Sequence, residues 1–128
     1  STKRFIYFAK DGEYKKTKKD LVRYVKSLDK NQHLFGIYKN DRIHVANFKI
    51  SIFNQEASLG FLVFLKYRGK GIIKNIFYKI IKLKLIKEHK IKKLLLGVDK
   101  KNLNAIKLYK NLGFKFKKNS SSIMYLFL

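Results

Sequence analysis

Apolar and polar residues recur with different periods along the chain, and each change of period predicts a change of secondary structure. Short apolar or alternating runs bounded by turn residues indicate strands, whereas apolar residues three and four positions apart indicate helices. The predicted strands are Arg4–Ala9, Leu34–Tyr38, Arg42–Ile52, Ala57–Leu65, Lys93–Val98, Phe114–Lys117 and Ile123–Leu128. Because short turns at Lys39–Asp41 and Asn54–Gln55 join the three strands between residues 34 and 65, we expect an antiparallel meander there.

Two strands are distinguished by how they meet the core. In the strand Arg42–Ile52, four apolar side chains are expected to face mostly inward, namely Ile43, Val45, Phe48 and Ile50. The strand Lys93–Val98 is apolar on both faces, which predicts a central position in the sheet.

Three stretches carry the helical period. Lys18–Leu28 follows Thr17, an N-cap residue, and the last helix follows the N-cap Asn102 and ends at Gly113. The longest helix begins at Ile72, and its wide apolar stripe consists of Ile72, Ile73, Ile76, Phe77, Ile80, Ile81 and Leu83. Strands and helices alternate without a linker or a repeat, so we expect one α/β domain over residues 1–128.

The stretch between residues 61 and 73 combines a strand, a turn and a helix start. The apolar run Phe61–Leu65 predicts a buried strand, and Arg68–Gly71 interrupts it with two glycines that can turn sharply and expose N–H groups. Free N–H groups at a helix start, beside Arg and Lys, form an anion site. The stretch therefore predicts phosphate binding.

Composition narrows the class of protein. With 128 residues, 46% apolar and 15% aromatic residues, the chain suits one folded domain. It has no Cys, which excludes disulfides and thiolate zinc sites. No apolar run reaches membrane-spanning length and no signal peptide is visible, so we expect a cytoplasmic protein that does not bind membranes.

The formal net charge of +23 has two interpretations. Its 31 Lys and Arg residues against 8 Asp and Glu residues suit an anionic partner such as nucleic acid or a phosphorylated ligand. Alternatively the charge is compositional, because the basic residues are spread along the whole chain, whereas nucleic-acid sites concentrate them on one face. We favour the second interpretation, with nucleic acid as the less favoured partner.

The order of motifs resembles the GNAT superfamily of acetyl-coenzyme A-dependent N-acetyltransferases. Residues 68–73 match its Gln/Arg-x-x-Gly-x-Gly/Ala pyrophosphate motif at Arg68 and Gly71, but carry Ile73 where the family usually has Gly or Ala. The second motif is Asn104–Tyr109, followed by Leu112-Gly-Phe. The resemblance covers residues 34–128 and implies the acyl-CoA N-acyltransferase fold, a mixed and mostly antiparallel central sheet flanked by helices. Because the family generally has a further strand and helix before the segment that matches Thr17–Leu28, we expect this N-terminal region to be abbreviated.

This resemblance also implies a cofactor site for acetyl-CoA, with no metal. The backbone of the turn would hold the pyrophosphate and the preceding strand would pair with the pantetheine arm, with the N–H of Val63 or a neighbour on the thioester oxygen. The cofactor-binding residues expected on this basis are Leu62, Val63, Phe64, Arg68, Gly69, Lys70, Gly71, Ile72, Ile73, Asn104 and Tyr109. The branched side chain of Ile73 would crowd the approach of the helix to the phosphates.

The same resemblance assigns the proton transfers. Tyr109 is the expected general acid for the leaving thiolate, because a phenol is protonated at neutral pH; its alternative is an ordinary core tyrosine. Asn104 either binds the cofactor arm or caps the helix, or does both. Glu56 and His44 are alternative general bases, although the family's carboxylate is commoner two residues later, at Ser58. For each of them we favour the alternative of an ordinary surface strand residue, and the amine can also lose its proton to water.

The predicted activity is direct acetyl transfer from acetyl-CoA to a primary amine, with a small amine such as an amino sugar or sugar nucleotide as acceptor. One alternative keeps the fold but places the amine on a protein N-terminus or an aminoacyl-tRNA. Another is a non-catalytic anion-binding module of the same fold, because Ile73 departs from the motif. We expect a monomer or a homodimer.

Overall fold

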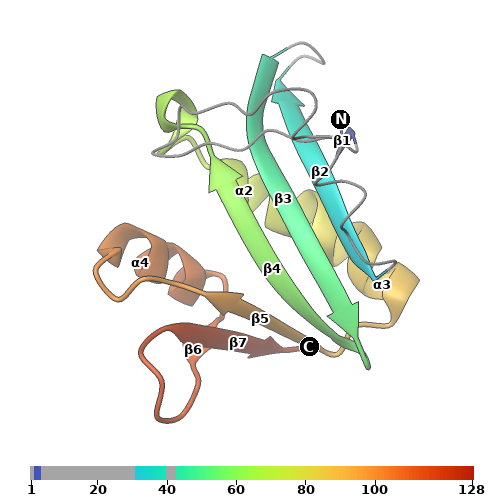
Figure 1. The fold of residues 1–128 in the computed structure, drawn as a ribbon, viewed down its shortest axis with the longest axis vertical. Coiled ribbons are helices and arrows are strands. Elements are labelled where there is room, and N and C mark those ends of the chain that lie inside the picture. The colour runs from blue at the N-terminus through green and yellow to red at the C-terminus, as the bar shows by residue number, and fades with distance from the viewer. Residues whose placement is uncertain (1, 4–30, 40–42) are drawn as a thin grey trace, which may run out of the picture. The chain divides into compact units, whose positions relative to one another are not determined.

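The computed structural model describes residues 2–3, 31–39 and 43–128 (Figure 1). The predicted strand Arg4–Ala9 and helix Lys18–Leu28 lie outside these residues. The contacts of the chain divide it into two units, each described here by itself. The first unit contains Ser1–Ser51 and Phe61–Ile73, and the second contains Ile52–Gly60 and Lys74–Leu128.

The strands of the first unit follow the order β1-β2-β3-β4. Their bounds are Thr2–Lys3 for β1, Gln32–Lys39 for β2, Ile43–Phe53 for β3 and Glu56–Val63 for β4, whose last three residues belong to this unit. β2 is antiparallel to both β1 and β3, as Figure 1 shows for β2 and β3. The Phe48 ring stacks on those of Phe35 and Phe61, at centroid distances of 5.7 and 5.3 Å, and this stack forms the centre of the unit.

Strand β3 is buried on both faces over its middle part. Ala46, Phe48 and Ile50 are fully buried on one face, and Asn47 is buried on the other. Val45, which is also buried, lies at a register shift between β2 and β3. The inward positions predicted for Val45, Phe48 and Ile50 are therefore confirmed, whereas that of Ile43 is wrong, since its side chain is 43% exposed. Because the register shift leaves Val45 as an extra residue opposite β2, a single alternating pattern could not describe the strand.

The strands of the second unit follow the order β4-β5-β7-β6. Strand β5 (Lys93–Gly97) pairs parallel with β4 and antiparallel with β7 (Ile123–Phe127), and β7 pairs antiparallel with β6 (Lys115–Phe116). The central position predicted for β5 is confirmed. With one parallel pair among antiparallel neighbours, the predicted mixed and mostly antiparallel sheet is also confirmed. The predicted turn at Asn54–Gln55 is present, with φ angles of 49° and 67°.

One face of this part of the sheet forms the core of the second unit. Residues that are paired across the strands share a face, so Leu59, Leu96, Met124 and Phe116 form one row. The first three are buried, as are four side chains of the long helix, which are Ile76, Phe77, Ile81 and Leu85. The opposite face carries Ser58, Leu95 and Tyr125.

The long helix contains a π-helical centre. It runs from α2 (Ile72–Ile76) through the π-helix η2 (Phe77–Leu85) into α3 (Ile86–His89), and the Ile86 N–H donates to the Ile81 carbonyl, five residues back. The predicted start at Ile72 is confirmed. The predicted burial of Leu83 is wrong, because its side chain is 68% exposed and Leu85 is buried instead. A wider π turn rotates Leu83 off the apolar stripe that a regular α-helix would give.

The chain between β4 and the long helix differs from its predicted form. The strand predicted to continue to Leu65 ends at Val63, and the 3₁₀ turn η1 (Leu65–Tyr67) follows, with Leu65 53% exposed. No helix that the described residues form is long and apolar enough to span a membrane.

Candidate active site

The turn after η1 has the backbone form that the sequence predicts. Gly69 and Gly71 have φ angles of +74° and +75°, which L side chains rarely adopt. A Cβ atom built on either glycine would meet no atom within 4 Å, so the positive φ, and not crowding, requires glycine here. The N–H groups of Gly69, Lys70 and Gly71 donate no hydrogen bond to another described residue, and Arg68 and Lys70 are exposed beside them. These residues fit a bound pyrophosphate.

The end of β4 is fixed to its neighbours by two hydrogen bonds. The Phe64 N–H donates to the Val45 carbonyl at 3.1 Å, and Arg68 Nε donates to the Val63 carbonyl at 3.0 Å. Successive residues of an extended strand direct their backbone groups to opposite edges, so the Val63 N–H faces away from β3. Leu62, Val63 and Phe64 were predicted to bind the cofactor. The Phe64 N–H is used in the hydrogen bond to β3, whereas the Val63 N–H is not directed toward β3.

His44 lies in a polar and aromatic cluster of the first unit. Its Nε2 is 2.7 Å from Oδ1 of the buried Asn47. The imidazole stacks on Tyr38 at 5.1 Å and meets the edge of Phe64 at 4.7 Å. An Nε2–H donated to the amide oxygen makes this nitrogen unavailable as a proton acceptor, and Nδ1 is buried. The surroundings of His44 thus favour a structural role, and its role as a base stays a prediction.

Helix α4 (Leu103–Asn111) ends in a Schellman motif that positions Tyr109. The Phe114 N–H donates to the Tyr109 carbonyl at 3.0 Å, and the Gly113 N–H donates to the Lys110 carbonyl at 3.0 Å. Gly113 has a φ of +104°, as its predicted place after the helix requires. The buried Phe114 ring lies 6.2 Å from that of Tyr109 and 5.9 Å from that of Phe77. The Leu-Gly-Phe sequence therefore returns an aromatic ring onto Tyr109.

Burial sets the chemistry of Tyr109. Its side chain is 8% exposed, and this desolvation raises the pKa of the phenol above its ordinary value. The group is therefore protonated at neutral pH and can act as a proton donor. At the other end of α4, Oδ1 of Asn102 accepts from the Ala105 N–H at 3.1 Å, so the predicted N-cap is confirmed. Asn104 is not the cap, and its side chain is exposed.

Glu56 lies at the start of β4 on the face opposite the core. Its carboxylate forms an ion pair with Lys93 Nζ at 4.0 Å, across the parallel ladder, and is half exposed. No described contact joins it to Tyr109. Among the residues that the structure describes, no three His, Asp or Glu side chains are grouped so as to hold a metal ion.

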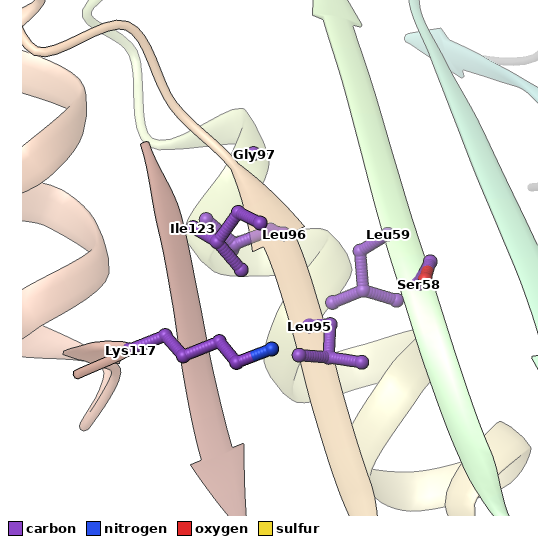
Figure 2. Close-up of a pocket in the computed structure, with 7 residues that line it drawn as sticks. All are labelled: Ser58, Leu59, Leu95, Leu96, Gly97, Lys117 and Ile123. Atoms are coloured by element: carbon purple, nitrogen blue, oxygen red, sulfur yellow. The ribbon is translucent and has the colours of Figure 1, made fainter. Parts of the chain in front are cut away.

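A pocket of about 300 Å³ lies within the second unit where the β4–β5 ladder ends. The ladder stops at the Leu59–Leu96 pair, although β4 itself continues to Val63. The pocket, shown in Figure 2, is lined by Ser58, Leu59, Leu95, Leu96, Gly97, Lys117 and Ile123. Leu59 and Leu96 face the core, whereas Ser58 and Leu95 face the other side, so the pocket passes between the two strands.

The sequence pointed to Ser58 only as the position where the family more often carries a carboxylate base. It gave no indication that Lys117 lines a pocket. The signal that could have found Lys117 is the closing hairpin. Because β6 pairs with β7, the residue that follows β6 must lie beside Ile123, where β7 begins.

The family model of the acetyltransferase (GNAT) family matches residues 4–114. The chain belongs to this family. The match includes the turn at Arg68–Gly71 and the segment Asn104–Tyr109, so the resemblance on which the site residues were predicted is confirmed at the level of the family. The roles of the individual residues stay predictions.

Solved structures of several N-acetyltransferases have the same fold as this chain. The PaiA N-acetyltransferase of Thermoplasma acidophilum, in complex with coenzyme A, is 23% identical, with a TM-score of 0.68 over 86% of this chain and 68% of that one. PseH of Campylobacter jejuni, in complex with acetyl coenzyme A, is 22% identical, with a TM-score of 0.70 over 85% and 78%. The spermidine N-acetyltransferase SpeG of Vibrio cholerae is 17% identical, with a TM-score of 0.73 over 96% and 81%. No curated protein matches the sequence.

Proposed function

We propose that this GNAT-family protein transfers the acetyl group of acetyl-CoA directly to the primary amine of a small molecule such as an amino sugar or a sugar nucleotide. The observation that carries the proposal is the turn Arg68–Gly71, whose left-handed glycines present unused N–H groups beside two exposed cations. Free N–H groups before a helix start suit a bound diphosphate, and this turn lies within the matched family domain.

Binding of the cofactor falls to residues at the end of β4 and in the turn. When bound, acetyl-CoA supplies an acetyl group activated as a thioester. Gly69 to Ile73 would hold its pyrophosphate with backbone N–H groups, and Arg68 and Lys70 would add positive charge. Leu62 and Val63 would line its pantetheine arm, and the Val63 N–H, directed away from β3, would be the donor for the thioester oxygen. One such donor stabilises the transition state by roughly 3 kcal/mol.

Tyr109 holds the proton that the leaving sulfur needs. Because burial raises its pKa, the phenol is protonated at neutral pH, and its oxygen can donate a proton to a thiolate. Asn104, which the Asn102 cap leaves uncommitted to capping, supplies an amide for the cofactor arm.

The general base that would remove a proton from the amine is the least defined part of the proposal. The Glu56 carboxylate is paired with Lys93, and Nε2 of His44 is hydrogen-bonded to Asn47. Each of these contacts competes with acceptance of a proton from the amine. We favour loss of the proton to water near the pocket, with Glu56 and His44 as alternatives that single substitutions can separate.

The alternatives involving an RNA-linked amine or a protein N-terminus are motivated by the charge of +23. One structure of the same fold is the Escherichia coli ribosomal-protein-alanine N-acetyltransferase, which is 20% identical with a TM-score of 0.66 over 88% of this chain and 77% of that one. A pocket of about 300 Å³ suits a small acceptor better than a macromolecule. The non-catalytic alternative rests on Ile73, which lies half-buried on the same side of α2 as the buried Ile76.

Calorimetry with acetyl-CoA, followed by an amine screen with thiol release as readout, tests the proposal. We expect binding in the micromolar range and a weaker affinity in an Arg68→Ala/Lys70→Ala variant. Lys66→Ala, on the preceding turn η1, is the matched control for removal of a nearby positive charge. Absence of binding in the wild-type protein would refute the enzymatic proposal.

A further inference from the structure

The pocket between β4 and β5 has a distinctive balance of charge. Leu59, Leu95, Leu96 and Ile123 provide an apolar wall, and Lys117 is the charged side chain that lines it. None of the described lining residues is a carboxylate. Figure 2 shows the Lys117 side chain extended over β7, with its amine directed toward Leu95. A ligand here therefore meets carbon surface on the strands and positive charge on the β6 side.

The loop between β6 and β7 holds Lys117 in this position. The Lys117 N–H donates to the Ile123 carbonyl at 2.8 Å, and the Lys117 carbonyl accepts from the Ser120 N–H at 3.0 Å. The Ser120 hydroxyl oxygen accepts from the N–H groups of Ser122 and Ile123 at 3.2 and 3.1 Å. The backbone of Lys117 is thus fixed, although its side chain is exposed.

The neighbouring charges on this face of the sheet leave the pocket positive. Glu56 shares the face with Ser58, but it is paired with Lys93 at 4.0 Å. Lys93 also lies over the rings of Tyr125 and Phe127, at 5.6 and 5.1 Å from their centroids. The ladder Leu95–Tyr125–Lys115 adds a further cation to the same face. Among the residues that the structure describes, Glu56 is therefore the acidic side chain on this face, and it already lies beside a cation.

We infer that the acceptor is a small amine that also carries an anionic group, a carboxylate or a phosphate, and that Lys117 binds this group while the apolar wall holds the carbon skeleton. A charge-assisted hydrogen bond from a lysine suits either anion. A polyamine is disfavoured because its remaining ammonium groups would face Lys117 in a pocket whose described lining contains no carboxylate. This inference rests on the proposed function, since it names the substrate class of the same enzyme.

Matched pairs of acceptors test the inference by thiol release. The pairs are D-glucosamine with D-glucosamine 6-phosphate and L-serinamide with L-serine, and spermidine is the polycation. We expect the anionic member of at least one pair to have a kcat/KM roughly 10 to 100 times that of its partner. The Lys117→Met variant should lose this advantage, and Lys118→Met, which removes the adjacent charge outside the pocket lining, should keep it.

A binding measurement separates this inference from the proposed function. In protein with labelled isoleucine methyl groups, the Ile123 signal, assigned with Ile123→Val, should shift on addition of glucosamine 6-phosphate or serine and shift far less in Lys117→Met. If acetyl transfer occurs but neutral amines or spermidine are preferred, the inference is overturned and the function stands. If no acceptor releases thiol, that result counts against the proposed function. The Ile123 titration then decides alone whether the pocket binds anionic amines. An Ile123 signal that does not shift, or that shifts equally in Lys117→Met, refutes the inference.

Discussion

Tyr109 is the residue whose chemistry depends most directly on its surroundings. Replacement by Phe keeps the ring against Phe114 but removes the only proton the side chain can donate. We expect kcat to fall roughly 10²- to 10⁴-fold, while the dissociation constant for acetyl-CoA stays within about threefold. Tyr78→Phe, on the exposed side of the long helix, is the control and should retain activity.

The pH profile checks the same assignment. The phenol keeps its proton below its pKa and loses it above, and burial moves that pKa upward. Wild-type activity should therefore show no loss attributable to Tyr109 until the pH exceeds about 10. A large loss of cofactor affinity in Tyr109→Phe with unchanged kcat would remove Tyr109 from the proton transfer.

Gly113 and Gly97 offer a second comparison of single residues. A Cβ at Gly113 would lie 3.2 Å from Leu126 Cδ1, at a φ of +104°, whereas a Cβ at Gly97 would lie 3.8 Å from the Ser122 carbonyl oxygen, without a positive φ. We expect Gly113→Ala to destabilise the fold by about 1–3 kcal/mol and Gly97→Ala to change it by about 0.5 kcal/mol or less. Thermal unfolding measures both, and equal effects would mean that the Schellman motif does not determine the end of α4.

At the scale of elements, the helical register of the long helix determines which of two leucines, Leu83 or Leu85, is buried and contributes to stability. In a regular α-helix Leu83 would lie on the buried stripe, but the π-helical centre exposes it and buries Leu85. We expect Leu85→Ala to cost about 2–5 kcal/mol of unfolding free energy, whereas Leu83→Ala should cost about 0.5 kcal/mol or less. Denaturant unfolding of the two variants decides the register, and a greater loss for Leu83→Ala would indicate an α-helical centre.

The elements that the sequence predicted well are those with a local cause. Asn102 caps α4 through a side chain three residues from its partner, and Gly113 ends the helix through its own φ. The long helix was predicted with its correct start, and Ile76, Phe77 and Ile81 of its predicted stripe are buried. Leu83 was predicted in place of Leu85, because apolar residues at 80, 81, 83 and 85 are compatible with either helical register. Only packing of the whole stripe chooses between them.

The candidate site was predictable to the extent that it is contiguous in sequence. The glycine turn and Tyr109 lie in short motifs, and the structure gives them the expected backbone form and burial. The pocket was not predictable, because it depends on where the β4–β5 ladder stops and on which loop residue the β6–β7 pairing returns to the sheet. Those are long-range facts of pairing that no single apolar pattern contains, and Lys117 therefore resembled every other lysine.

At the scale of the whole molecule, the basic residues are spread along the entire sequence. Lys66, Lys82, Lys93 and Lys110 each lie over an aromatic ring, and they belong to four different elements. Such contacts are each worth about 0.5–1 kcal/mol at exposed sites, so they offset part of the repulsion among the cations. This dispersion supports the compositional interpretation of the +23 charge over a dedicated nucleic-acid surface.

The excess of positive charge should still make stability depend on salt. Eight acidic residues cannot neutralise 31 basic ones, so repulsion opposes the compact state and is screened as ionic strength rises. The screening length falls from about 30 Å at 0.01 M salt to about 8 Å at 0.15 M. We expect Tm to rise by several degrees over this range, since about 1 kcal/mol corresponds to roughly 3–6 °C in a domain of this size.

A variant with Lys74, Lys79 and Lys87 changed to Gln identifies the cause of this salt effect. All three side chains are exposed on the long helix, and their loss removes repulsion without touching the core. The variant should therefore have a higher Tm than the wild type in 0.01 M salt and a smaller rise up to 0.15 M. A wild-type Tm that falls with salt would mean that attractive ion pairs outweigh repulsion. If the Tm of the variant rises with salt as much as that of the wild type, specific ion binding, and not screening, stabilises the fold.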